Sequence, residues 1–161
     1  MTETRVLEPL VDADEVLSIL SDISIFAGLS EKQLHQLFRQ LKKVSYRKNE
    51  TVFEQGHEPS YIYIVKSGRI KLIGEEEGTK YELFVFDRGN CFGEASIIGI
   101  LPHAASAVAI EDSELIVLSR NALLAFYKTD LELFSTLILN IAREVCRRLY
   151  KTDQVLLHYI H

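Results

Sequence analysis

The sequence predicts a mainly β domain with helices at both ends. The central part of the chain alternates apolar and polar residues at the period of a β-strand, and turn signals interrupt it at regular intervals. Amphipathic helical patterns precede and follow this part. Short strands that follow one another in this way favour an antiparallel barrel or sandwich. The 161 residues, 47% hydrophobic and 25% charged, are typical of one globular domain.

Two helices are predicted before the β region, and residues 1–11 are expected to be loose. A capping-box pattern at Asp12 starts a short amphipathic helix, and a stronger one at Ser30 starts a second helix that extends to about Lys42. Lys42 and Lys43 would then lie at the end of this helix, where positive charge is favourable.

The β region begins at Val44, where the period of the pattern changes to two. Tyr61–Val65 is almost entirely apolar or aromatic, which is typical of a central strand buried on both faces. Glu75–Gly78 is predicted to be a charged, solvated loop. The predicted strands cover residues 44–46, 51–53, 61–65, 69–73, 81–86, 105–110 and 114–118.

The stretch between Asp87 and Asp112 is predicted to form a turn, one turn of helix and then a strand. Gly93 and Glu94 open the short helix. The free backbone N–H groups of a helix start point at one spot, and this arrangement is suited to holding an anion.

A short helix is predicted over residues 121–127 and a long one from Asp130 to about Tyr159. One face of the long helix repeats apolar residues in steps of four and three, as in a coiled-coil seam. Because Phe134, Leu137 and Ile141 offer a separate face to the barrel, a second copy of the helix is the better partner for the seam. We therefore predict a parallel or near-parallel homodimer. The predicted seam consists of Ile138, Ala142, Val145, Leu149, Leu156 and Tyr159, with Thr152 as its polar member.

Composition excludes several classes of protein. No apolar run is long enough to span a membrane, and the N-terminus lacks a signal-peptide pattern, so a soluble, cytoplasmic protein without membrane contact is predicted. The net charge of −5 argues against a general affinity for nucleic acid. Cys91 and Cys146 are too few for an iron–sulfur cluster or a cysteine-rich zinc site, and no metal site is predicted.

The runs Gly56–Leu72, Gly89–Glu94 and Pro102–Ala109 resemble the cyclic nucleotide-binding domain, most closely that of the catabolite-activator and fumarate-nitrate regulators. The resemblance covers about residues 23–156. It implies a double-stranded β-helix, or jelly-roll-like barrel, with N-terminal helices and a long C-terminal dimerisation helix. The expected organisation is an N-terminal extension over residues 1–22, the β-roll over residues 23–129 and the dimerisation helix over residues 130–161.

The resemblance also implies a phosphate-binding cassette at Phe92–Ala107 and a possible ligand, cyclic AMP or cyclic GMP, with no cofactor. Glu94 would then bind the ribose 2′-hydroxyl, the amides after Gly93 would face the phosphate, and Thr152 would contact the adenine edge. The alternative for Thr152 is a polar residue that sets the register of the seam. The candidate ligand-binding residues are Phe92, Gly93, Glu94, Ala95, Ser96, His103, Ala104, Ala105 and Thr152.

Two departures from the family pattern affect function. His103 takes the place of the cassette arginine, and Ala104 takes the place of the hydroxyl residue that follows it. Losing a buried charge-assisted contact costs on the order of 2–4 kcal/mol, or roughly 30- to 1,000-fold in affinity. In addition, the sequence shows no helix-turn-helix after the long helix, so direct DNA binding is not expected and the effector protein is unknown.

Two functions remain open. The first is a small-molecule sensor that binds a cyclic nucleotide or a related anion weakly or atypically. The second is a degenerate domain that no longer binds and acts as a dimeric protein-interaction module. An enzyme is not expected, because Glu94 and His103 have no nucleophile or metal site beside them.

Overall fold

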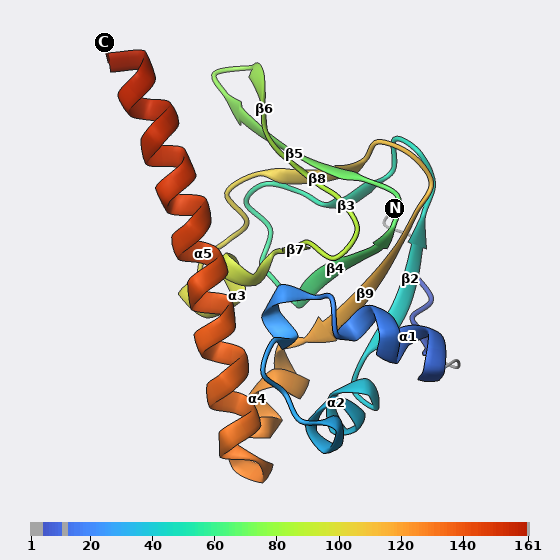
Figure 1. The fold of residues 1–161 in the computed structure, drawn as a ribbon. Helices are drawn as coiled ribbons and strands as arrows, with labels where there is room; N and C mark the ends of the chain where they lie inside the picture. Colours follow the sequence, from blue (N-terminus) through green and yellow to red (C-terminus); the bar gives the residue numbers. More distant parts are fainter. Residues whose placement is uncertain (1–4, 11–12, 161) are drawn as a thin grey trace.

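The computed structural model describes residues 5–10 and 13–160. Two β-sheets form its centre, helices cover one end of them, and the long C-terminal helix runs along one side (Figure 1). In chain order the elements are β1 (Glu8–Pro9), α1 (Ala13–Leu20), the 3-10 helix η1 (Ser24–Phe26), α2 (Glu31–Phe38), β2 (Lys42–Tyr46), β3 (Thr51–Phe53), β4 (Tyr61–Ser67), β5 (Ile70–Glu76), β6 (Thr79–Phe86), β7 (Cys91–Phe92), α3 (Glu94–Gly99), β8 (Ser106–Ala109), β9 (Ser113–Ser119), α4 (Arg120–Thr129) and α5 (Leu131–Ile160).

The two sheets are antiparallel, as the strand pattern predicted. One has the order β1-β2-β9-β4-β7 and the other the order β3-β8-β5-β6, so the barrel is not closed into one continuous sheet. The arrangement of mainly β sheets with flanking helices and a long C-terminal helix confirms the predicted jelly-roll class.

Strand β4 is buried on both faces, as its apolar sequence predicted. Ile62 and Ile64 belong to a core between this sheet and the helices, whereas Tyr63 and Val65 belong to a second core between the two sheets. Successive side chains of a strand point to opposite faces, so β4 contributes to both cores. It also pairs with β7, the strand in which the candidate cassette begins.

Helix α2 begins as predicted but ends earlier. Ser30 and Gln33 form the reciprocal capping box, with Gln33 N donating to Ser30 Oγ at 3.2 Å. The helix ends at Phe38, and Lys42 and Lys43 begin β2 rather than closing α2. The prediction for these lysines was therefore wrong. Strand pairing with β9 decides their conformation, and Lys43 Nζ lies 3.4 Å from the Glu114 carboxylate across that pair.

The N-terminal segment is also more ordered than predicted. Glu8 and Pro9 pair with Lys43 and Lys42 as an edge strand, although residues 1–11 were expected to be loose. The predicted capping residue Asp12 lies outside the described residues. The helix that was expected after it is α1, whose Ile19 and Leu20 are buried in the helix-side core.

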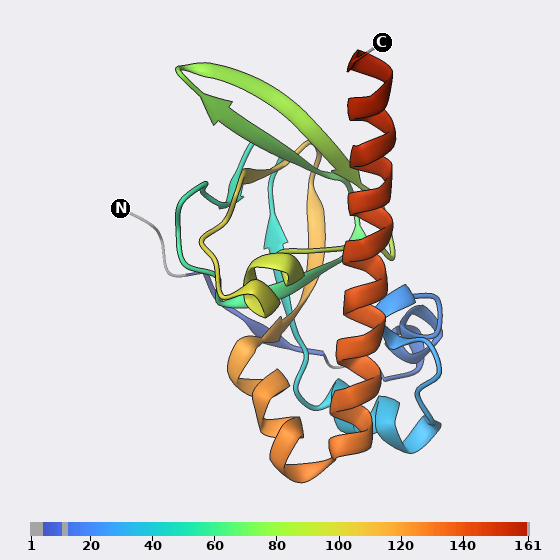
Figure 2. The ribbon, with the colours of Figure 1, turned by 90° about the vertical axis from the view of Figure 1, so that its left-hand side faces the viewer.

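The hairpin of β5 and β6 is longer than predicted. Glu75 and Glu76, assigned to a loop from their charge, pair with Lys80 and Thr79. The hairpin extends away from the rest of the sheet, at the same end of the molecule as the C-terminal end of α5 (Figures 1 and 2).

Helix α5 has two parts with different surroundings. Its first half packs on the domain through Leu133, Leu137 and Ile141, which are all buried. Every residue from Leu149 to Ile160 is exposed, and this part extends past the sheets except for the β5–β6 hairpin, which reaches nearly as far (Figures 1 and 2).

Candidate ligand-binding site

The cassette turns sharply from strand β7 into helix α3 at Gly93. This residue has a φ of 80°, in the left-handed region, and a Cβ there would lie 3.1 Å from the Tyr61 carbonyl oxygen and 3.2 Å from the Tyr63 ring. Glycine alone adopts this conformation readily and leaves room for the neighbouring strand. The turn thereby directs Glu94 inward.

Glu94 is completely buried and forms an ion pair with Arg148 of α5. The pair joins Glu94 Oε1 to the Arg148 guanidinium. Among the residues that the structure describes, neither oxygen of Glu94 accepts a hydrogen bond, and Oε1 alone makes the ion pair with Arg148. A buried carboxylate oxygen with an unused lone pair is costly, so Oε2 is suited to receive a hydrogen bond from a ligand.

Arg148 was not anticipated from the sequence. Its guanidinium carbon lies 5.5 Å from the centre of the Phe86 ring, and only 21% of its side chain is exposed. Burial lowers the pKa of the Arg148 guanidinium, and the nearby Cys91 opposes this shift only in part. A signal was available, because Arg148 lies one helical turn before the predicted contact Thr152 and hence on the same face of α5.

His103 lies inside an aromatic cluster rather than at an open cationic site. Its ring stacks on Phe53 with centroids 3.6 Å apart and planes 9° from parallel, and only 4% of the residue is exposed. Burial, helped by the electrostatic effect of the nearby His57, lowers the pKa of His103 below its ordinary value. His103 is therefore neutral at pH 7.

The other rings of this cluster connect His103 to the start of the cassette. The Phe92 ring stacks on Tyr63 at 5.1 Å and on Phe86 at 5.3 Å, and Phe53 lies 5.9 Å from Phe92. The space between the sheets beside the cassette is thus lined by aromatic side chains.

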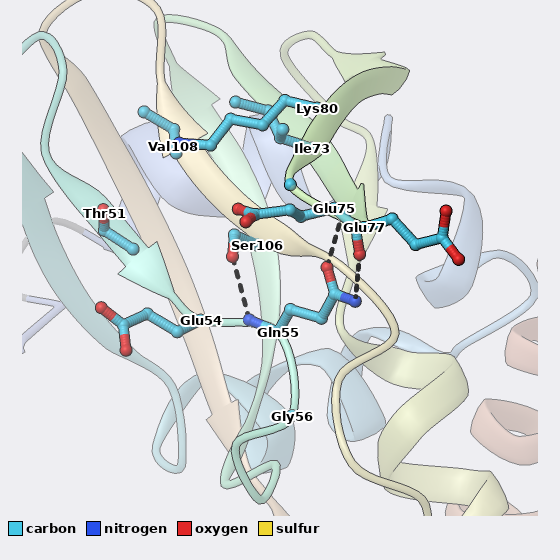
Figure 3. A pocket seen from close by; sticks show the side chains of 11 residues that line it. Thr51, Glu54, Gln55, Gly56, Ile73, Glu75, Glu77, Lys80, Ser106 and Val108 are labelled. Atoms are coloured by element: carbon cyan, nitrogen blue, oxygen red, sulfur yellow. Dashed lines mark hydrogen bonds between the residues drawn. The ribbon is translucent and has the colours of Figure 1, made fainter.

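The loop after β3 holds the backbone of His103 in place. Gly56 N donates to the His103 carbonyl at 2.8 Å, and His103 N donates to the His57 carbonyl at 2.9 Å. Gln55, just before this loop, forms hydrogen bonds through its side-chain amide to both backbone groups of Glu75, at 2.9 and 3.1 Å. Figure 3 shows this bridge in a polar cavity of about 690 Å³ on the outer side of the four-stranded sheet.

The predicted site residues differ in how deeply the structure buries them. Phe92, Glu94, His103 and Ala105 are buried, whereas Ala95 and Ala104 are exposed. Ser96 is half-buried in α3.

Thr152 is exposed on α5, and its hydroxyl donates to the Arg148 carbonyl at 3.0 Å. The contact of Thr152 with a ligand base stays a prediction, as do the roles of the cassette residues.

The predicted dimer seam is partly turned toward the domain. Ile138 and Val145 are half-buried and pack against the helix-side core. Exposed residues follow one another on α5 in steps of three, four or seven. This exposed stripe consists of Leu139, Ala142, Cys146, Leu149, Leu156 and Ile160.

Residues 43–130 match the family profile of the cyclic nucleotide-binding domain. The chain belongs to this family. The match includes the whole cassette, from β7 to β8, and it confirms the resemblance on which the sequence analysis relied.

The curated relatives of this cyclic nucleotide-binding domain include bacterial regulators of the catabolite-activator group. The chain is 30% identical over 137 residues to the CRP-like cAMP-activated global transcriptional regulator of Mycobacterium tuberculosis, covering 84% of this chain and 59% of the relative. It is also 30% identical over 133 residues to the cyclic AMP receptor protein of Thermus thermophilus, covering 80% of this chain and 58% of the relative. The chain thus spans about three fifths of the length of these relatives.

Solved structures show the same fold. A cyclic nucleotide-binding domain from Methylobacillus flagellatus superposes with a TM-score of 0.80 at 21% identity, covering 90% of this chain and 83% of that one. The catabolite activator protein of Thermus thermophilus gives a TM-score of 0.73 at 29% identity, covering 83% of this chain and 61% of that one.

Within residues 5–10 and 13–160, no helix is long and apolar enough to cross a membrane. The same residues contain no group of three or more His, Cys, Asp or Glu side chains placed to hold a metal ion.

Proposed function

We propose that this domain is a regulatory module that senses a small molecule of the cyclic-nucleotide type at the cassette Phe92–Ala107 and transmits its presence through α5. The observation that carries the proposal is the ion pair of Glu94 with Arg148. A ligand that hydrogen-bonds to Glu94 changes the surroundings of the carboxylate that pairs with Arg148 of α5. If the ligand makes better contacts in one position of α5 than in another, its binding favours that position.

The binding is atypical because His103 replaces the cassette arginine. An arginine would offer a permanent charge and a bidentate contact to a phosphate. A neutral imidazole stacked on Phe53 offers neither. The affinity for a cyclic nucleotide is accordingly lower, by the 30- to 1,000-fold that loss of such a contact roughly implies.

The proposed output is a change in a homodimer formed through α5. The exposed stripe of α5 is apolar, and exposed apolar surface of this extent is typical of a protein–protein contact. A second copy of the same helix supplies a matching stripe. An effector protein would read the altered dimer, and direct contact with DNA is not part of the proposal.

Titration calorimetry with cyclic AMP and cyclic GMP tests the proposal. We expect measurable heat with at least one of them, and we expect Glu94→Gln to weaken the binding by about tenfold or more, because hydrogen bonds to charged groups contribute about 1.5–3 kcal/mol. Glu132→Gln, an exposed position in the first turn of α5, is the matched control and should bind like the parent chain.

A second candidate function is a degenerate domain that dimerises without binding a ligand. The stacking of His103 on Phe53 inside the aromatic cluster favours it, because these side chains occupy the region that faces the cassette. The absence of heat with nucleotides and nucleosides alike, together with a dimer in solution, would select this reading.

A further inference from the structure

The cassette contains no permanent positive charge of its own. From residue 89 to residue 119 the sequence has no lysine or arginine, and Glu94 and His103 are the titratable residues between Phe92 and Ala107. An anionic group bound there would have to find its counter-charge elsewhere.

His103 does not supply that charge at neutral pH. Its ring is buried and stacked face to face on Phe53. Burial and the electrostatic effect of His57 lower its pKa, and the opposing effect of Glu58 is smaller. Protonating the ring would place a charge between aromatic side chains, away from water.

Arg148 is a cation that contacts the cassette, and its guanidinium is already paired with Glu94. Its partner Glu94 is completely buried, so an incoming anion would compete with the carboxylate for the same guanidinium. If the anion succeeded, Glu94 would be left buried without a counter-charge, which is strongly unfavourable. The pair is neutral as a unit and suits a neutral ligand.

Glu94 Oε2 indicates the type of group that such a ligand presents. This oxygen is buried and accepts no hydrogen bond from the described residues, and an ionised carboxylate is an acceptor only. A hydroxyl donates to it, whereas a phosphate oxygen repels it. In a 3′,5′-cyclic nucleotide two ribose oxygens are esterified and the 2′-hydroxyl remains, but a nucleoside keeps three hydroxyls.

We infer that the cassette selects an uncharged, hydroxyl-bearing ligand of the nucleoside type over the corresponding cyclic nucleotide. The inference rests on the proposed function, because it names the class of ligand for the same site. It uses the neutral Glu94–Arg148 pair, the unsatisfied carboxylate oxygen and the stacked, uncharged His103.

Calorimetry on the full chain compares adenosine with cyclic AMP and guanosine with cyclic GMP at about pH 7.5. We expect at least one nucleoside to bind at least about tenfold more tightly than its cyclic nucleotide, which corresponds to about 1.4 kcal/mol. The matching 2′-deoxynucleoside should lose about tenfold or more, because it removes one hydroxyl donor.

His103→Arg provides a second test, in which the ligand preference is expected to move toward the cyclic nucleotide. It places a permanent charge in the cassette, so the preference should shift by at least about tenfold toward the cyclic nucleotide. His35→Arg is the matched control, since His35 is exposed on α2, and its ligand preference should equal that of the parent chain.

The outcomes separate the inference from the proposed function. A parent chain that binds cyclic nucleotides as tightly as nucleosides, or more tightly, overturns the inference and leaves the proposed function standing. A parent chain that binds neither class overturns the proposed function and the inference with it.

Discussion

At the scale of single residues, the cassette depends on a charge that comes from another element. Glu94 reaches the interior because Gly93 permits the turn, and Arg148 reaches it from α5. Removing one partner of a buried ion pair destabilises a protein far more than replacing both partners with apolar residues, because the remaining charge stays buried without a counter-charge. The pair is therefore a sensitive point of the structure.

Arg148→Met should lower the free energy of unfolding by about 3–5 kcal/mol, as measured by urea denaturation, because Glu94 loses its counter-charge. The double variant Glu94→Gln with Arg148→Met should recover much of this loss, since no charge then remains buried. Arg147→Met is the adjacent control. Arg147 pairs with Glu144 at the surface, so its loss should stay within about 1 kcal/mol. Equal losses for the two arginine variants would contradict the buried pair.

His103 should make stability depend on pH. Burial lowers its pKa in the folded chain below the value of about 6.5 in the unfolded chain, so the unfolded chain binds a proton more readily. Its contribution to stability is complete above about pH 6.5 and is lost as the pH falls below that value. His103→Phe keeps a ring against Phe53 but does not titrate. Between about pH 7.5 and pH 5.5 the free energy of unfolding in urea should therefore fall more for the parent chain than for His103→Phe. Equal decreases in the two chains would show that His103 is not buried as a neutral ring.

The sequence indicated some residues of the candidate site and missed Arg148 for a physical reason. Glu94 and His103 lie in a local motif, where glycine spacing fixes the turn and the neighbours. Arg148 becomes part of the site only through the packing of α5 against the cassette, and nothing in the local sequence of either element records that contact. Its position one turn before Thr152 was the remaining clue.

At the scale of secondary-structure elements, periodicity predicted strands and helices well and their ends less well. The capping box at Ser30 fixed the start of α2, whereas its end was missed because Lys42 and Lys43 fit both a helix terminus and an edge of a strand. Pairing with β9 and β1 makes these two lysines part of a strand, and pairing between segments so far apart in the sequence leaves no local signal. The β5–β6 hairpin was predicted too short for another reason, because the charge of Glu75 and Glu76 was taken as the mark of a solvated loop.

The exposed stripe of α5 predicts a specific cross-link. If two α5 helices pair in parallel along Leu139, Ala142, Cys146 and Leu149, the two Cys146 thiols face each other across the dimer axis. Mild oxidation should then give a disulfide-linked dimer on non-reducing gels. Cys146→Ser should abolish it.

Cys91→Ser is the control for that cross-link and should leave it unchanged. Cys91 is buried, and burial raises the pKa of its thiol to about 12, so it is almost entirely protonated and unreactive at neutral pH. Retention of the linked dimer in Cys146→Ser, or its loss in Cys91→Ser, would contradict the parallel arrangement along the exposed stripe.

At the scale of the whole molecule, polar contacts of Arg148 and Asn140 attach α5 to the domain. Arg148 connects it to the cassette, and the buried Asn140 connects it to the N-terminal segment, where its amide donates to the carbonyls of Ile25 and Ala27 at 3.1 and 2.7 Å. The two residues lie two helical turns apart and both face the domain. If ligand binding shifts α5, as the proposed function requires, the contacts of Asn140 would change with it, and binding would be linked to the packing of the N-terminal segment.

Asn140→Ala should uncouple α5 from the N-terminal segment without touching the cassette. The carbonyls of Ile25 and Ala27 would lose their donor, and leaving buried polar groups unsatisfied costs about 1–3 kcal/mol, so the urea midpoint should fall accordingly. Hydrogen exchange should speed up in η1 and in the first half of α5, because their mutual contact is weakened, and should change little in strands β4 and β9. Gln154→Ala removes an exposed amide from the same helix and should alter neither quantity. Uniform acceleration across β4, β9 and α5 would instead mean that Asn140 supports global stability and that α5 has no separate attachment there.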